Sequence, residues 1–181
     1  RLAYIIQDFE PGFYNWSNTY ALAEATYHRA QETVAIINSE ELTNFVLARY
    51  DFALAYCLPY EPHPRLAELM EPTEPERLIL AYARPGVSRN CFELLCEGLR
   101  LWQAQNPAQS KVYEIVLAGE EFGEDRIAGL LNARNAAKMS INDYAAMLNR
   151  AAVGISLMVS PHPSYPPLEM ASAGCVTPPA P

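Results

Sequence analysis

The sequence predicts an α/β protein built on a parallel β-sheet with helices on both of its faces. Short apolar runs rich in branched residues alternate one by one with segments of helical period. The apolar runs are nearly continuous, which is typical of strands that are buried on both faces of a sheet. Regular alternation of strand and helix favours parallel pairing, because each strand must return through a crossover.

The first series of elements occupies residues 1–58. Runs 3–7 and 33–37 are typical of buried strands, and apolar residues between them repeat at helical spacing. Asn38 or Ser39 can cap a helix that follows the second of these strands. We therefore expect part of an α/β domain here.

Residues 59–76 separate the two series. This stretch contains many prolines and few strand-forming residues, a composition that predicts a linker. A second α/β domain is expected over residues 77–181.

The second series contains four predicted strands and the beginning of a fifth. The predicted strands are 78–82, 113–119, 133–137 and 153–159, and another begins at Cys175. The predicted helices are 90–103, 124–131, a helix capped by Ser140, and 166–173. Ligands of parallel sheets bind at the carboxyl ends of the strands. Loops 83–90, 119–124 and 160–168 are therefore the candidate binding loops.

Charge and composition exclude several classes of function. A net charge of -8 argues against nonspecific binding to nucleic acid or to an anionic membrane. No apolar run approaches the roughly 20 residues that span a bilayer, and the opening residues do not resemble a signal peptide. Four cysteines without metal-ligand spacing predict reduced thiols in a cytoplasmic protein and no metal site. Since the chain begins without methionine, we expect a segment of a longer protein.

Loop 83–90 carries Arg84 and Arg89 around a Pro-Gly turn, before a predicted helix. Guanidinium groups and the N–H groups of a helix amino terminus together suit a diphosphate. Two solvated surface arginines are an equally good interpretation of the loop alone.

Loop 119–124 begins with Gly119 at the end of a predicted strand. A glycine there lets a base or a ribose approach the backbone closely. The carboxylates that follow favour a solvated helix start, because acidic residues interact well with a helix amino terminus.

Loop 160–168 is stiffened by prolines, the last two of which fit the first turn of a helix. This leaves the N–H groups of Ser164 and Tyr165 as expected donors to a phosphate, at low entropic cost. Glu169 follows one turn into the helix, where it can accept hydrogen bonds from two sugar hydroxyls or simply offset the helix dipole. His162 is a candidate donor to a sugar hydroxyl, or a solvated loop histidine.

Several segments resemble a known family of enzymes. "LAYARPGVSRNCFELLCEGL", "IVLAGE" and "KMSINDYAAMLNRAAVGISLMVSPHPSYPPLEMASAG" resemble the carboxyl-terminal domain of family-four GT-B glycosyltransferases, particularly rhamnosyltransferases of bacterial surface-polysaccharide assembly. "YIIQDFEPGFYNWSNTYALAEATY" resembles a late segment of their amino-terminal domain. The resemblance implies two Rossmann-like domains. Residues 1–58 would be the incomplete end of the acceptor-side domain, and residues 77–181 a donor domain truncated at its end.

The resemblance also implies an activity. It is a hexosyltransferase reaction that moves rhamnose, with retention, from dTDP-rhamnose to a glycan or lipid-linked glycan acceptor, without an obligatory metal or other cofactor. Such a protein would be cytoplasmic, at times associated with the inner face of the membrane.

Individual site residues follow from the family motifs. Arg84 and Arg89 match the basic residues that meet the diphosphate, although many relatives carry lysine at the second position. Glu169 matches the second glutamate of a paired motif, which contacts the ribose. The first glutamate falls on Pro161, beside His162, so the identity of the sugar stays open.

Asp8 and Glu10 lie two residues apart at a predicted strand end, where their side chains can point the same way. In a complete GT-B enzyme this end faces the acceptor, so Asp8 is a candidate base or orienting group. A polar loop before Pro11 and Gly12 is an equally good interpretation.

Two other functions stay open beside the transferase. One is a non-catalytic module that binds nucleotide sugars or scaffolds partner enzymes. The other is an epimerase or hydrolase, because one fold hosts several chemistries.

Overall fold

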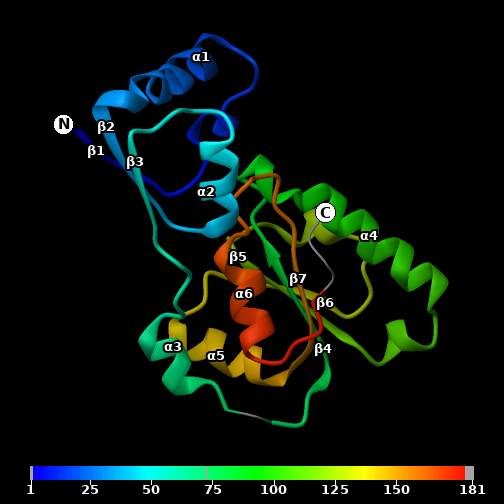
Figure 1. The fold of residues 1–181 in the computed structure, drawn as a ribbon. Coiled ribbons are helices and arrows are strands. Elements are labelled where there is room, and N and C mark those ends of the chain that lie inside the picture. Colours follow the sequence, from blue (N-terminus) through cyan, green and yellow to red (C-terminus); the bar gives the residue numbers. More distant parts are fainter. Residues whose placement is uncertain (1, 72, 178–181) are drawn as a thin grey trace. The chain divides into compact units, whose positions relative to one another are not determined.

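The computed structural model describes residues 2–71 and 73–177. The chain forms two compact units (Figure 1). Unit 1 comprises Arg1–Glu61 with Ser160–Ser164, and unit 2 comprises Pro62–Val159 with Tyr165–Pro181. The change from one unit to the other after Glu61 falls within the stretch that we expected to be a linker. The inclusion of Ser160–Ser164 in unit 1 was not expected from the sequence.

Unit 1 is a parallel sheet with the strand order β1-β2-β3. Its elements are β1 (Leu2–Ile6), the 3-10 helix η1 (Glu10–Phe13), α1 (Asn18–Ala25), the 3-10 helix η2 (Tyr27–Glu32), β2 (Thr33–Ile37), α2 (Glu40–Leu47) and β3 (Leu54–Cys57). Both predicted strands are confirmed, whereas β3 was missed. Ser39 caps α2, since its hydroxyl accepts a hydrogen bond of 3.1 Å from the Leu42 N–H.

Unit 2 is a parallel sheet with the strand order β6-β5-β4-β7. Its strands are β4 (Glu76–Ala83), β5 (Glu114–Gly119), β6 (Ala133–Ala137) and β7 (Ala151–Ser156). Its helices are α3 (Pro64–Leu69), α4 (Phe92–Gln105), α5 (Ile141–Arg150) and α6 (Tyr165–Ser172), with 3-10 helices η3 (Ser88–Asn90), η4 (Gln109–Lys111) and η5 (Glu124–Ile127). The predicted α/β class is confirmed. The helix expected over 124–131 is only the single turn η5, and the strand expected at Cys175 is a bridge between Val153 and Val176.

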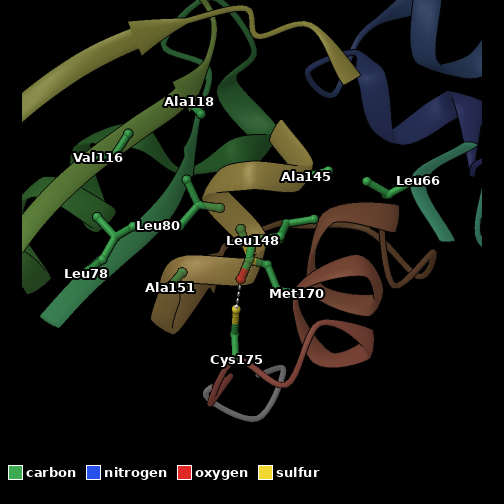
Figure 2. Close-up of a cluster of buried hydrophobic side chains, with 10 residues drawn as sticks. All are labelled: Leu66, Leu78, Leu80, Val116, Ala118, Ala145, Leu148, Ala151, Met170 and Cys175. Carbon is green, nitrogen blue, oxygen red and sulfur yellow. Dashed lines mark hydrogen bonds between the residues drawn. The ribbon is translucent and has the colours of Figure 1, made fainter. Parts of the chain in front are cut away.

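Both faces of the unit 2 sheet are buried, which explains its nearly continuous apolar strands. Leu78 and Leu80 of β4 face α5 and α6, in the core cluster that Figure 2 shows. Ile79 and Ala81 alternate with them and face α4 on the opposite side of the sheet. The sheet is therefore a middle layer between two sets of helices.

The strand order creates a switch point in unit 2. From β4 the sheet extends to β5 and β6 on one side and to β7 on the other. Ligands of such sheets bind at the carboxyl edge close to this kind of switch point.

Residues 59–76 are more ordered than a plain linker, and this corrects our expectation. Pro64 occupies the first turn of α3, where a missing N–H costs nothing. Leu66 of α3 is 2% exposed and packs into the core of unit 2. The prolines in this stretch predicted a linker without regular structure, but Pro64 begins a helix instead.

Candidate functional site

Unit 2 has a cavity of about 450 Å³ at the carboxyl edge of its sheet. Tyr82 of β4 and Gly119 of β5 contribute its wall at the sheet. The remaining wall comes from α3, from the residues that follow β6, from α5 and from α6. Of the residues proposed from the sequence, the structure brings three together here, namely Gly119, Tyr165 and Glu169.

Glu169 lies one turn into α6 and is half-buried at the cavity. Burial raises the pKa of its carboxyl group, while Tyr144 and His63 act in the opposite direction. The Tyr144 hydroxyl is close enough to influence that pKa, yet within the described chain it forms no hydrogen bond of normal geometry. Glu169 thus presents a partly desolvated carboxylate to the cavity, which suits acceptance of hydroxyl hydrogen bonds.

Gly119 ends β5 with φ +133°, a backbone conformation that disfavours every residue with a Cβ atom. A Cβ added there would lie 3.0 Å from the Tyr82 ring, 3.1 Å from the Ala83 carbonyl oxygen and 3.1 Å from Arg84 Cγ. The close approach that requires glycine is therefore to the chain's own neighbouring strand.

Gly119→Ala is expected to lower the free energy of unfolding by about 1–3 kcal/mol, because it combines an unfavourable φ with tight contacts. The measurement is denaturant unfolding of both proteins. Gly98→Ala is the matched control, since Gly98 lies in α4 and a Cβ would meet no atom within 4 Å. This control should gain about 0.5–1 kcal/mol, as helix propensity favours alanine. Equal stability of the two variants would contradict the expectation.

Arg84 and Arg89 lie in the loop after β4, and neither lines the cavity. Val87 N–H donates to the Arg84 carbonyl oxygen at 3.0 Å and closes the Pro-Gly turn. The Glu120 carboxylate accepts a bond of 3.1 Å from Gly86 N–H and ties this turn to the end of β5. The structure thus places Arg84 beside Gly119, through its Cγ atom.

The surroundings of Arg89 differ from the prediction. Arg89 lies in η3, and Cys91 with φ +51° separates this turn from the start of α4. The sequence predicted that Arg89 stands directly before a long helix. In the structure, Asn90 and Cys91 lie between Arg89 and the start of α4.

Within unit 1, Ser160–Ser164 is held by a chain of short polar contacts. The Ser160 hydroxyl donates to the Asp8 carboxylate and accepts a bond of 3.0 Å from the His162 N–H. The Ser164 N–H donates to His162 Nδ1 at 2.9 Å. This bond corrects our expectation of a free Ser164 N–H.

His162 is 5% exposed, so it is not a solvated loop histidine. Burial lowers its pKa, against the opposing influence of Asp8 and Glu41. A neutral imidazole that accepts at Nδ1 carries its proton on Nε2. His162 is therefore set as a donor through Nε2.

Asp8 and Glu10 lie beyond the end of β1, so the expectation of a shared direction on a strand is wrong. Asp8 accepts a bond of 2.7 Å from the next residue's N–H. Glu10 begins η1 and accepts a bond of 3.4 Å from the Tyr4 hydroxyl. The two carboxylates have separate partners.

His63, Lys138 and Tyr144 are among the cavity residues that were not proposed from the sequence. Lys138 is exposed and directly follows β6, so it lies at the fourth strand end of the carboxyl edge. The signal that could have found it is this rule of strand ends, which we applied to only three loops.

Among residues 2–71 and 73–177, no group of three or more His, Cys, Asp or Glu side chains could hold a metal ion. In those residues no helix has the length and apolarity to cross a membrane. All four cysteines are free thiols.

Known proteins resemble the chain in both sequence and fold. The O-antigen biosynthesis protein RfbC of Myxococcus xanthus is 31% identical over 181 residues, covering 94% of this chain and 13% of RfbC. A TarM variant of S. aureus, solved with fondaparinux, alpha-GlcNAc-glycerol and UDP, has a TM-score of 0.69 at 14% identity, covering 97% of this chain and 36% of TarM. Sucrose-phosphate synthase from Thermosynechococcus elongatus has a TM-score of 0.67 at 13% identity, covering 97% of this chain and 49% of that enzyme.

The likeness to these solved structures shows a GT-B-type fold. The chain spans only 13% of RfbC and about a third of TarM. The WsaF family matches it in two parts, with the C-terminal domain over residues 77–177 and the N-terminal domain over residues 1–40. Since the first of these matches alone covers more than half of the sequence, the chain belongs to the WsaF family.

Proposed function

We propose that the chain is the donor-binding part of a glycosyltransferase that assembles bacterial surface polysaccharide. The observation that carries this proposal is the cavity at the carboxyl edge of the unit 2 sheet, which presents the Glu169 carboxylate. Membership of the WsaF family and the likeness to a protein of O-antigen biosynthesis support it.

The finer parts of the proposal rest on the motif resemblance. They are membership of glycosyltransferase family four, dTDP-rhamnose as the sugar donor, retention at the anomeric carbon, and a glycan or lipid-linked glycan as the acceptor. We also propose that the protein is located in the cytoplasm, at times at the inner face of the membrane.

Each site residue has a role in this proposal. Glu169 accepts hydrogen bonds from the sugar hydroxyls of the nucleotide, between walls formed by Gly119 and Tyr165. Lys138, Arg84 and Arg89 supply positive charge to the diphosphate, so the proposed reaction uses no metal or other cofactor. Charge that grows on the departing diphosphate is stabilised best by such preorganised donors.

In this proposal Asp8 orients the acceptor hydroxyl, whereas His162 donates its Nε2 proton to a hydroxyl of the donor sugar. Ser164 keeps His162 in that tautomer through its N–H.

Thermal unfolding with thymidine, uridine, guanosine and adenosine diphosphates tests the donor site. A ligand at about 100 times its dissociation constant stabilises the fold by about 2.7 kcal/mol, which is several degrees. We expect the largest shift with thymidine diphosphate. Glu169→Ala should weaken binding about tenfold, so that the stabilisation at the same concentration falls to about 1.4 kcal/mol.

Glu97→Ala is the matched control, because Glu97 is an exposed residue of α4 that pairs with Arg100. Its nucleotide shift should equal that of the unchanged chain. Absence of any shift with all four diphosphates would refute the proposed donor site. Binding without sugar transfer or donor hydrolysis would favour the non-catalytic module instead.

A further inference from the structure

Tyr144 and Glu169 approach each other from two different helices at the cavity. Tyr144 lies in the first turn of α5, where its N–H donates to the carbonyl oxygen of the capping residue Ser140 at 2.9 Å. Glu169 lies on α6, and both residues line the cavity. Two rigid elements thus fix the relative position of a phenol and a carboxylate.

The Tyr144 hydroxyl is buried, and within the described chain no hydrogen bond satisfies it. Buried hydroxyl groups in native proteins are almost always paired, so an unpaired one requires an explanation. The residue also packs against the core cluster of α5, α6 and the sheet. Since packing alone would be served equally well by phenylalanine, the hydroxyl is the feature to be explained.

Burial keeps the Tyr144 hydroxyl protonated, because it raises the pKa of this phenol, with the nearby Glu169 as a further cause. The group is therefore a permanent hydrogen-bond donor. The carboxylate of Glu169 is a strong acceptor within its electrostatic reach.

A carboxylate that receives sugar hydroxyls must be both ionised and oriented. Burial works against ionisation of Glu169, whereas a donor behind it favours the charged form. Support of this kind places a binding group more precisely than the cavity wall alone.

We propose that Tyr144 is a positioning residue, whose hydroxyl donates to the Glu169 carboxylate when a nucleoside diphosphate binds and so holds it toward the sugar hydroxyls of the nucleotide. This inference rests on the proposed donor site. It adds to that site a residue whose hydroxyl acts through Glu169.

Tyr144→Phe is expected to weaken binding of thymidine diphosphate about fivefold, in line with the loss of one hydrogen bond. The pH dependence should change as well. Binding requires ionised Glu169 and is lost as the pH falls through the pKa of that group. Without the donor this pKa rises, so the variant should lose binding at a higher pH. A purely structural tyrosine would not move this profile.

A second measurement needs no nucleotide. Because Tyr144 already lowers the pKa of the Glu169 carboxyl group in the ligand-free chain, carbon-13 NMR titration should show a higher pKa in Tyr144→Phe than in the unchanged chain. Tyr113→Phe is the matched control, because this tyrosine packs edge-on against Trp102 in the opposite core of unit 2. It should change neither the Glu169 titration nor the binding profile.

The outcomes separate this inference from the one on which it rests. An unchanged pKa of Glu169 in Tyr144→Phe, with unchanged affinity, overturns the positioning role while the donor site stands. A raised pKa in a chain that binds no diphosphate overturns the nucleotide part of both proposals and leaves only the coupling of the two side chains.

Discussion

Replacing Arg84 by alanine is expected to weaken binding of a nucleoside diphosphate about a hundredfold, while binding of the free nucleoside is unchanged. Arg84 directly follows β4 at the carboxyl edge of the sheet, and its Cγ atom lies beside Gly119. A guanidinium can make two parallel charge-assisted bonds to a phosphate, each worth about 1.5–3 kcal/mol. Such bonds exist only when the ligand carries phosphate groups.

Calorimetric titration with thymidine, its monophosphate and its diphosphate resolves this effect. The loss of affinity should grow with the number of phosphate groups in Arg84→Ala, whereas in Glu169→Ala it should be the same for all three ligands. Arg84→Lys should recover part of the affinity, because lysine keeps the charge but lacks the planar fork.

Arg100→Ala is the control for general loss of positive charge. Arg100 lies on α4 and pairs with Glu97 at the surface. A similar loss of affinity in Arg100→Ala, or equal losses for all three ligands in Arg84→Ala, would refute a direct phosphate contact by Arg84.

Much of the fold was predictable because its strands are buried on both faces. The predicted strands at 33–37 and 133–137 coincide with β2 and β6. The limits of β4, β5 and β7 differ by a few residues, as tertiary contacts decide where a strand ends. The helix cap at Ser140 was also correct, and its hydroxyl accepts from the Asp143 N–H at 3.2 Å.

The missed elements lack the signals on which sequence analysis depends. Strand β3 is only four residues long and mostly exposed, so it shows no buried apolar run. Helix α3 begins at Pro64 inside a proline-rich stretch, where prolines usually indicate a break. Only the burial of Leu66 in the unit 2 core reveals why it forms.

The candidate site was predictable where it depends on strand ends. Gly119 and Glu169 followed from the rule that ligands bind at the carboxyl edge and from the motif resemblance. Tyr144 was not proposed, because helical spacing does not show which hydroxyl approaches a carboxylate on another helix. The Ser164 N–H was misjudged because a histidine two residues earlier competes for it, a local choice that spacing alone does not reveal.

Leu148→Ala is expected to lower the free energy of unfolding of unit 2 by about 2–5 kcal/mol, the range for a fully buried leucine. Leu148 of α5 is 0% exposed and lies in the core cluster of Figure 2. Its carbonyl oxygen also accepts a contact of 3.7 Å from the Cys175 thiol. Removal of the side chain leaves a cavity that α5, α6 and the sheet can fill only in part.

Denaturant unfolding gives this value, with Leu101→Ala as the control. Leu101 lies in α4 but is 59% exposed, so its variant should stay within about 0.5 kcal/mol of the unchanged chain. A loss below about 1 kcal/mol in Leu148→Ala would contradict the burial of this side chain.

The same experiment shows whether the two units unfold as one. Leu42 is the corresponding fully buried leucine of unit 1, where it packs with Tyr27 and Ile37. If each unit unfolds by itself, the chain has two transitions, and Leu148→Ala shifts only one of them while Leu42→Ala shifts only the other. If unfolding is a single transition, both variants shift it together. Added nucleotide distinguishes the two cases as well. A ligand of the unit 2 cavity stabilises one of two transitions if the units unfold separately, and the single transition if they unfold together.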